Sequence, residues 1–178
     1  MKQAYLKEVQ KLREFSHVDK KIIGRFITRI ASTDNLTIEN NSLVHFCSFF
    51  VPVDKKWKGI YIGHHIKADD WIPPGGHIKI GESPQQTALR EFGEELNYKV
   101  NKESIHLFDL SIIPVRKTGS RKCKIHYDFW YLVYVESIDF KFDKNEFHAA
   151  DWFTFEEALQ KTKSPIYNAI MRKIKAFV

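Results

Sequence analysis

Three glutamates, Glu91, Glu94 and Glu95, lie three and four residues apart in the segment REFGEEL. On a helix, side chains at this spacing are neighbours, with Cβ atoms about 5–6 Å apart. Carboxylates this close repel one another unless a cation lies between them, and hard divalent cations such as Mg²⁺ or Mn²⁺ prefer oxygen ligands. The spacing therefore poses a choice between a metal site and a helix face that is merely solvated.

The residues before the glutamates favour the metal site. Gly75 and Gly76 precede the segment, and glycine lets a backbone carbonyl approach a ligand closely. The run Ser83-Pro84-Gln85-Gln86 marks a helix start, with a capping Ser, Pro at the first position and Gln at the third. A helix from Ser83 to about Leu96 would be anchored by one face and would present carboxylates on another. The anchoring residues predicted from the helical rotation are Ala88, Leu89, Phe92 and Leu96.

The segment from Gly76 to Tyr98 resembles the Nudix box, G-x5-E-x7-R-E-U-x-E-E-x-G-U, in which U is a bulky apolar residue. Every charged position of that signature is filled here. The departure is Asn97, which stands where the family has Gly. Asn also tolerates the left-handed conformation at a helix C-terminus, so we expect the helix to end there all the same.

The resemblance implies an α+β fold, the Nudix-type α/β/α sandwich with a mixed central sheet and a catalytic loop-helix after the Gly-Gly turn. It extends to about residues 43–160. Apolar residues at helical spacing predict two extra N-terminal helices, and alternating or continuous apolar runs predict strands at residues 43–53, 105–116 and 124–135. We expect residues 1–34 to be a helical extension packed on a Nudix domain of residues 35–178. A lid or a dimer contact is the alternative for the extension.

Nudix hydrolases cleave a nucleoside diphosphate linked to another moiety (NDP-X) with the help of Mg²⁺ or Mn²⁺. The resemblance assigns Glu91, Glu94 and Glu95, with a carbonyl of Gly75 or Gly76, to the metal. Glu91 and Glu94 would also be catalytic. A structural ion pair is expected between Glu82 and Arg90, both of which belong to the box.

The general base is left open by the resemblance, since family members draw it either from the box or from a later loop. Glu146, in the segment KNEFHAADWF, is the later candidate, and an exposed loop carboxylate is the alternative reading.

Contacts with the substrate are predicted for a few cationic or polar side chains. His126 and Asp128 alternate along a predicted strand and so share one face. Each of these side chains has an ordinary alternative, either a hydrogen bond to its neighbours or a solvated loop position. The full set is His77, His126, Asp128, Arg116 and Lys67.

Composition fits one globular domain, since 178 residues with 43% hydrophobic residues can bury a sizeable core. No apolar run is long enough to cross a membrane, so we expect a soluble, cytoplasmic protein with reduced cysteines. The net charge of +6 admits anionic partners. A nucleotide-type substrate is the main expectation. The alternatives are an RNA pyrophosphohydrolase or RNA-binding module and a non-enzymatic nucleotide sensor, and a homodimer is open.

Overall fold

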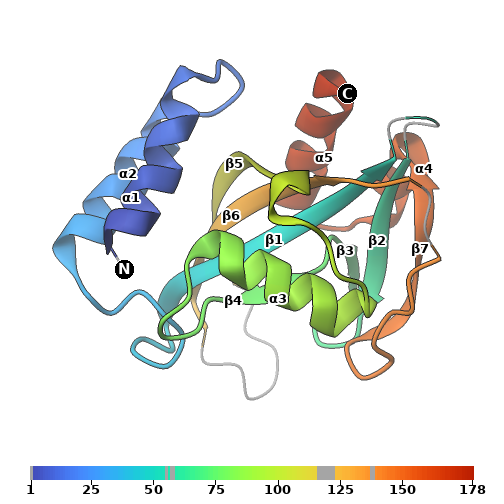
Figure 1. Ribbon diagram of the computed structural model, residues 1–178, viewed down its shortest axis with the longest axis horizontal. Helices are drawn as coiled ribbons and strands as arrows, with labels where there is room; N and C mark the ends of the chain where they lie inside the picture. The colour runs from blue at the N-terminus through green and yellow to red at the C-terminus, as the bar shows by residue number, and fades with distance from the viewer. Residues whose placement is uncertain (1, 55, 57–58, 116–122, 137–138) are drawn as a thin grey trace. The chain divides into compact units, whose positions relative to one another are not determined.

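The computed structural model describes residues 2–54, 56, 59–115, 123–136 and 139–178 (Figure 1). The two N-terminal helices, the helix after Ser83 and the strands near residues 43–53, 105–116 and 124–135 are present, as the sequence predicted. The α-helices are α1 (Lys2–Lys11), α2 (Lys20–Ser32), α3 (Pro84–Leu96), α4 (Phe155–Lys161) and α5 (Pro165–Phe177), with short 3₁₀ turns at Leu12–Glu14 and Lys102–Ser104. The strands are β1 (Val44–Asp54), β2 (Gly59–His65), β3 (Asp70–Ile72), β4 (Gly75–His77), β5 (Ile105–Pro114), β6 (Ile125–Tyr134) and β7 (Phe147–Thr154).

The strands form one mixed sheet, in the order β3-β2-β1-β6-β5, with β4 paired to β1 and β7 paired to β2. Strand β2 runs antiparallel to β1, β3 and β7. Strand β1 is buried on both of its faces, which explains its continuous apolar sequence. The α+β Nudix-type fold expected from the sequence is therefore confirmed.

The chain divides into two compact units, each built from several segments. Unit 1 comprises Met1–Phe49, Gly76–Ala88 and Leu107–Tyr131, and unit 2 comprises Phe50–Gly75, Leu89–His106 and Leu132–Val178.

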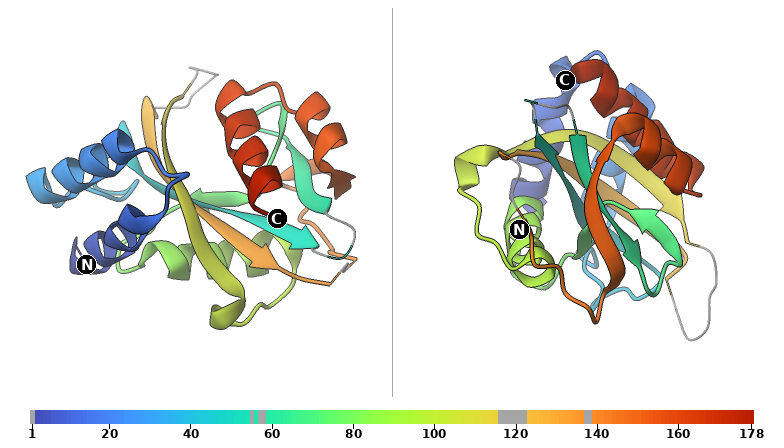
Figure 2. Two further views of the ribbon diagram at one scale, coloured as in Figure 1. Left: turned by 90° about the horizontal axis from the view of Figure 1, so that it is seen from above. Right: turned by 90° about the vertical axis from the view of Figure 1, so that its right-hand side faces the viewer.

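Unit 1 has an aromatic core that joins the N-terminal helices to β1 and β6. Helices α1 and α2 lie side by side (Figures 1 and 2). Tyr5 and Phe26 make edge-to-face contacts with both Phe46 and Phe129, at ring-centroid distances between 5.3 and 6.0 Å. All four rings are fully buried, so α1 and α2 contribute to the core of unit 1. A domain boundary near residue 34 stays a prediction.

Unit 2 holds the second core, in which Phe50 of β1 stacks on Phe92 of α3 at 4.6 Å. Helix α4 starts at a capping box between Thr154 and Glu157, and Ser164 caps α5. Helices α4 and α5 are neighbours in unit 2 (Figure 2). None of the helices in the described part of the chain has the length and apolar character that a membrane span needs.

Helix α3 begins and ends where the sequence predicted. The hydroxyl of Ser83 accepts a hydrogen bond from the backbone N–H of Gln86, and the Gln86 side chain accepts one from the N–H of Ser83. Asn97 follows the last helical residue with φ = 49°, in the left-handed region. Asn97 therefore adopts the left-handed conformation that ends the helix, as expected for the residue that replaces the Gly of the Nudix box.

Candidate metal and catalytic site

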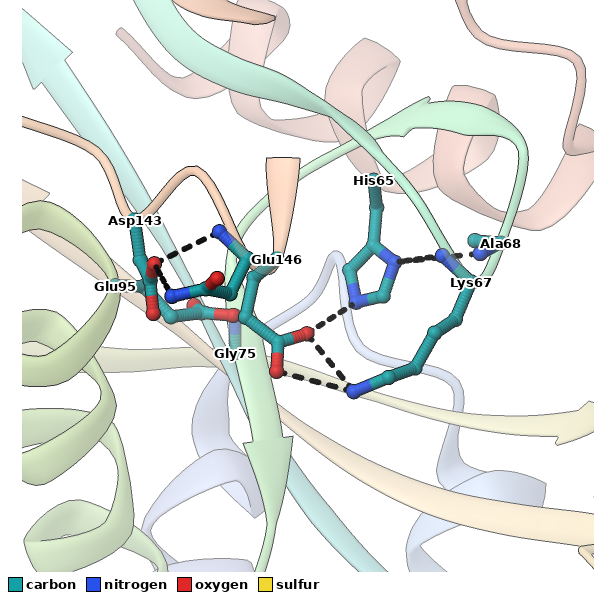
Figure 3. Close-up of polar contacts among 8 residues, drawn as sticks. His65, Lys67, Ala68, Gly75, Glu95, Asp143 and Glu146 are labelled. Atoms are coloured by element: carbon teal, nitrogen blue, oxygen red, sulfur yellow. Dashed lines mark hydrogen bonds and ion pairs between the residues drawn. The ribbon is translucent and has the colours of Figure 1, made fainter. Parts of the chain in front are cut away.

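Glu95 lies at the centre of the candidate site in unit 2 (Figure 3). Its side chain is only 4% exposed, and its Oε2 accepts a 2.7 Å hydrogen bond from the N–H of Gly75. Gly75 has φ = 147°, a conformation that side-chain-bearing residues rarely adopt. Burial, followed by repulsion from Glu91, raises the pKa of Glu95 well above its usual value, although the bond from Gly75 opposes the shift. Charges on Glu146 and Glu94 act in the same direction, so all four carboxylates share one electrostatic environment.

Arg90 forms ion pairs with both Glu91 and Glu94. Its Nη1 lies 2.7 Å from Oε1 of Glu91 and 2.7 Å from Oε2 of Glu94. The Glu91 side chain is mostly buried, whereas that of Glu94 is 54% exposed. The guanidinium therefore offsets part of the negative charge and holds these carboxylates beside Glu95 on the same helix.

Glu146 occupies a loop that approaches this cluster. Its carbonyl accepts a hydrogen bond from Ile66, and its carboxylate pairs with Nζ of Lys67 at 3.0 Å and lies 3.5 Å from Nε2 of His65 (Figure 3). The Nδ1 of His65 faces the backbone N–H groups of Lys67 and Ala68, at 3.0 and 3.2 Å. Because Nδ1 accepts from these groups, the proton of a neutral ring is on Nε2, which directs it toward Glu146.

The loop before Glu146 is fastened to the end of α3. The N–H of Asp143 donates a 2.7 Å hydrogen bond to the carbonyl of Glu95, and Oδ1 of Asp143 accepts from the backbone and the side chain of Asn145. The C-terminal turn of α3 thereby sets the position of the loop that carries Glu146 (Figure 3).

The two residues of the predicted structural ion pair, Glu82 and Arg90, lie in different units. Glu82 lies in unit 1, where its Oε2 accepts a 2.7 Å hydrogen bond from the hydroxyl of Thr87 and a longer one from the N–H of Lys79. Arg90 lies in unit 2 with the partners described above. The Glu82–Arg90 ion pair and a role for Gly76, which also lies in unit 1, stay predictions.

The predicted substrate contacts fall in different places. Lys67 is paired with Glu146, and Arg116 lies outside the described residues. His77 and His126 are half-buried in unit 1, with ring centroids 5.2 Å apart. Asp128 is fully buried and accepts a hydrogen bond from Ser111; burial raises its pKa to about 8. Their contacts with a substrate stay predictions.

The sequence did not predict the partners of Glu146, or those of His77 and His126. No sequence motif indicates the contact of His65 with Glu146, because this contact depends on the pairing of β2 with β7. His45 and Cys123 lie beside His77 and His126 in unit 1. The spacing Cys123-x-x-His126 was a signal that could have pointed to them.

The donor set of the unit 2 site fits a hard divalent cation. Glu91, Glu94 and Glu95 carry carboxylate oxygens and Gly75 a carbonyl oxygen, which are the ligand types that hard cations prefer. That these residues hold a cation stays a prediction. Burial of the Glu95 carboxylate among like charges is costly without a cation, which gives a physical reason for cation binding here.

A glycine turn, a capped helix rich in glutamate and a buried carboxylate at its end are the structural counterparts of the Nudix box residues from Gly76 to Tyr98 and of the Gly75 that precedes them. The chain belongs to the Nudix family: the model of the NUDIX domain matches residues 48–174. This confirms the resemblance seen in the Nudix box.

The chain is also similar to individual proteins. A Lactococcus lactis protein named probable DHNTP pyrophosphohydrolase is 36% identical over 86 residues, which are 47% of this chain and 51% of the relative. The chain thus matches about half the length of that relative.

Two solved structures have the same fold. The dihydroneopterin triphosphate pyrophosphohydrolase of E. coli has a TM-score of 0.65 at 18% identity, over 75% of this chain and 96% of that one. The Ap4A hydrolase of C. elegans has a TM-score of 0.61 at 22% identity, over 74% of this chain and 96% of that one.

Proposed function

We propose that this protein is a pyrophosphohydrolase that uses Mg²⁺ or Mn²⁺ to hydrolyse a phosphoanhydride bond of an NDP-X compound, by attack of water at phosphorus. The observation that carries the proposal is the buried Glu95, held to Gly75 and surrounded by Glu91, Glu94 and Glu146. Bound divalent cations would neutralise the diphosphate and acidify water.

The residues of the chain have distinct roles in this proposal. Glu91, Glu94 and Glu95 would hold the cations, with the Gly75 carbonyl as a further ligand. Arg90 orients Glu91 and Glu94, and Asp143 holds the following loop against α3.

Glu146 would be the general base that takes the proton of the attacking water. Its carboxylate oxygens are kept in place by Lys67 and His65. A general base must lie within hydrogen-bond reach of the proton it removes, and a carboxylate fixed from one side by two donors keeps lone pairs for the water.

The substrate class is supported by the names of the relatives. Dihydroneopterin triphosphate and Ap4A both carry a chain of phosphates on a larger organic group, so both contain the phosphoanhydride bond that the proposal requires. We therefore place these two compounds first in a screen that also contains NDP-sugars, NTPs, NADH, CoA and triphosphorylated RNA.

The screen measures phosphate released with Mg²⁺ or Mn²⁺, after phosphatase treatment of the products. Protein with Glu91→Gln, purified in the same way, controls for contaminating phosphatases. Turnover in ¹⁸O-labelled water, followed by mass spectrometry of the products, would identify the phosphorus that is attacked. Absence of turnover across the screen, together with absence of Mg²⁺ binding by calorimetry, would favour the sensor alternative instead.

A further inference from the structure

Four nitrogen and sulfur side chains converge in unit 1, apart from the carboxylates of unit 2. They are His45, His77, Cys123 and His126, and one ligand atom of each lies within 4.8 Å of the others. Cys123 Sγ lies 3.6 Å from Nε2 of His45 and 4.0 Å from Nε2 of His77. The histidine rings surround this sulfur, with His45 4.8 Å from His77 and 4.9 Å from His126 between centroids.

The spacing of these atoms fits a single tetrahedral ion. With Zn–N near 2.0–2.1 Å and Zn–S near 2.3 Å, the ligand atoms of a tetrahedral zinc site lie about 3.3–3.8 Å from one another. The two sulfur–nitrogen distances are within a few tenths of an ångström of this range. The other pairs of ligand atoms lie within 4.8 Å of one another, so these atoms would have to move closer together around a bound ion.

The backbone around the cluster is well fixed. Cys123 and His126 flank the start of β6, where the N–H groups of Lys124 and Ile125 both donate to the carbonyl of Leu43. The N–H of Ile78, next to His77, donates to the carbonyl of Phe46, next to His45. Three chain segments that are distant in sequence are thus held at hydrogen-bonding distance, and each contributes a ligand.

His45 has the surroundings of a metal-bound histidine. It is fully buried, and its Nδ1 lies 2.8 Å from the carbonyl of Asn41. This carbonyl requires the proton on Nδ1, which leaves the lone pair of Nε2 directed at Cys123.

The donor atoms select a different ion from that of the glutamate site. A thiolate and imidazoles suit Zn²⁺, whereas Mg²⁺ requires oxygen ligands. The geometry points to a second metal centre in this protein, a structural zinc site formed by His45, His77, Cys123 and His126. Four protein ligands close the coordination sphere, so this ion joins β1, β4 and β6 and takes no part in hydrolysis.

The test uses the full chain with Glu95→Gln, which weakens the carboxylate site, freed of metal by a chelator and kept reduced. Titration with Co²⁺ should produce, at one equivalent, a thiolate-to-cobalt charge-transfer band and the intense visible bands of a four-coordinate ion. Zn²⁺ should displace the Co²⁺, and excess Mg²⁺ should not. Zinc should also raise the melting temperature, since it binds the folded state.

Variants of the ligands decide the assignment. Cys123→Ser should abolish the charge-transfer band, and His77→Gln should weaken Zn²⁺ binding by at least about 10²-fold, the upper end of the effect of losing a partner outside the coordination sphere. His148→Gln is the matched control, since His148 is exposed in unit 2 and outside the cluster.

A cobalt spectrum of the Glu95→Gln protein without the charge-transfer band, or a band that persists when Cys123→Ser is added, would overturn the zinc site. If Cys123→Ser does not fold, His77→Gln decides alone, and unchanged Zn²⁺ affinity in that variant counts against the proposal. Magnesium-dependent hydrolysis is measured separately, so either proposal can fail without the other.

Discussion

The backbone N–H of Gly75 donates a hydrogen bond of 2.7 Å to Oε2 of Glu95, a residue 20 positions later in the chain. This bond fixes the buried carboxylate against the glycine turn. A carboxylate has about four lone-pair sites, so one N–H leaves capacity for a cation. Gly75 and the end of α3 therefore lie together within unit 2.

Glu95→Gln should separate metal binding from folding. The amide is nearly isosteric and keeps an oxygen for the Gly75 N–H, but it removes a buried charge that Glu91, Glu94 and Glu146 repel. We expect kcat to fall by at least roughly 10²-fold, the scale of one lost electrostatic contact in the transition state. The metal-free melting temperature should equal or exceed that of the wild type, and the gain on adding Mg²⁺ should shrink.

The matched control is Glu103→Gln, an equal change of charge at an exposed position of unit 2. It should leave turnover and the Mg²⁺-induced shift unchanged. Near-wild-type turnover and metal shift in Glu95→Gln would mean that the glutamates are an ordinary helix face.

Glu146→Gln should behave differently from the metal-ligand variants. If Glu146 is the general base, kcat falls by about 10²–10⁴-fold, while the Mg²⁺ dependence of the melting temperature stays close to that of the wild type. Stopped-flow or steady-state kinetics and thermal melts measure the two effects. A loss of Mg²⁺ affinity equal to that of Glu95→Gln would reassign Glu146 as a metal ligand.

Lys67→Met tests how Glu146 is held. Lys67 contacts both carboxylate oxygens, so its loss should reduce kcat less than the loss of Glu146 itself. The double variant should be no worse than Glu146→Gln alone, because the contribution of Lys67 acts through Glu146. Additive losses would show that Lys67 has a separate role.

The sequence predicted the parts of the site that depend on local rules. Capping of α3 by Ser83 and the spacing of the three glutamates involve residues within a few positions of one another. Likewise, strand alternation correctly placed His126 and Asp128 on one face.

The parts that depend on tertiary contacts could not be predicted. The burial of Glu95 is one example, since the helical rotation gave it only a place beside Glu91 and Glu94. The contact of Glu146 with His65 and the approach of His45 to Cys123 are others. These pairs are separated by many residues, and their contact depends on strand pairings that no local pattern encodes.

Asn97 offers a test of the end of α3. With φ = 49°, Asn97→Gly should be neutral or slightly stabilising. Asn97→Val should cost about 1–2 kcal/mol, because a β-branched residue is strained in the left-handed conformation. Urea denaturation measures both changes. Lys99→Val, an exposed position just beyond, is the control, and equal costs for the two Val variants would argue against strain at Asn97.

Gly63 supports the loop of Glu146 through the next residue, Phe147. A Cβ on Gly63 would lie 2.3 Å from Cδ1 and 2.7 Å from Cε1 of the Phe147 ring, which is almost fully buried. Gly63→Ala should therefore cost about 1–3 kcal/mol, as overpacking usually does. Because a displaced Phe147 also shifts Glu146, we expect kcat to fall as well.

Gly93→Ala is the matched change in the same unit. A Cβ there has no atom within 4 Å, and Gly93 lies in the interior of α3, so the same substitution should stabilise the protein by about 0.5–1 kcal/mol through helix propensity. Urea denaturation of both variants gives the two free energies of unfolding, and equal m-values would show that the comparison is between similar states. The chemical change is identical, so the opposite signs follow from the space around each Cβ and from the helical position of Gly93. If Gly63→Ala were as stable as the wild type, the Phe147 ring would have room to move. A loss of kcat in that variant could then not be attributed to overpacking against Phe147.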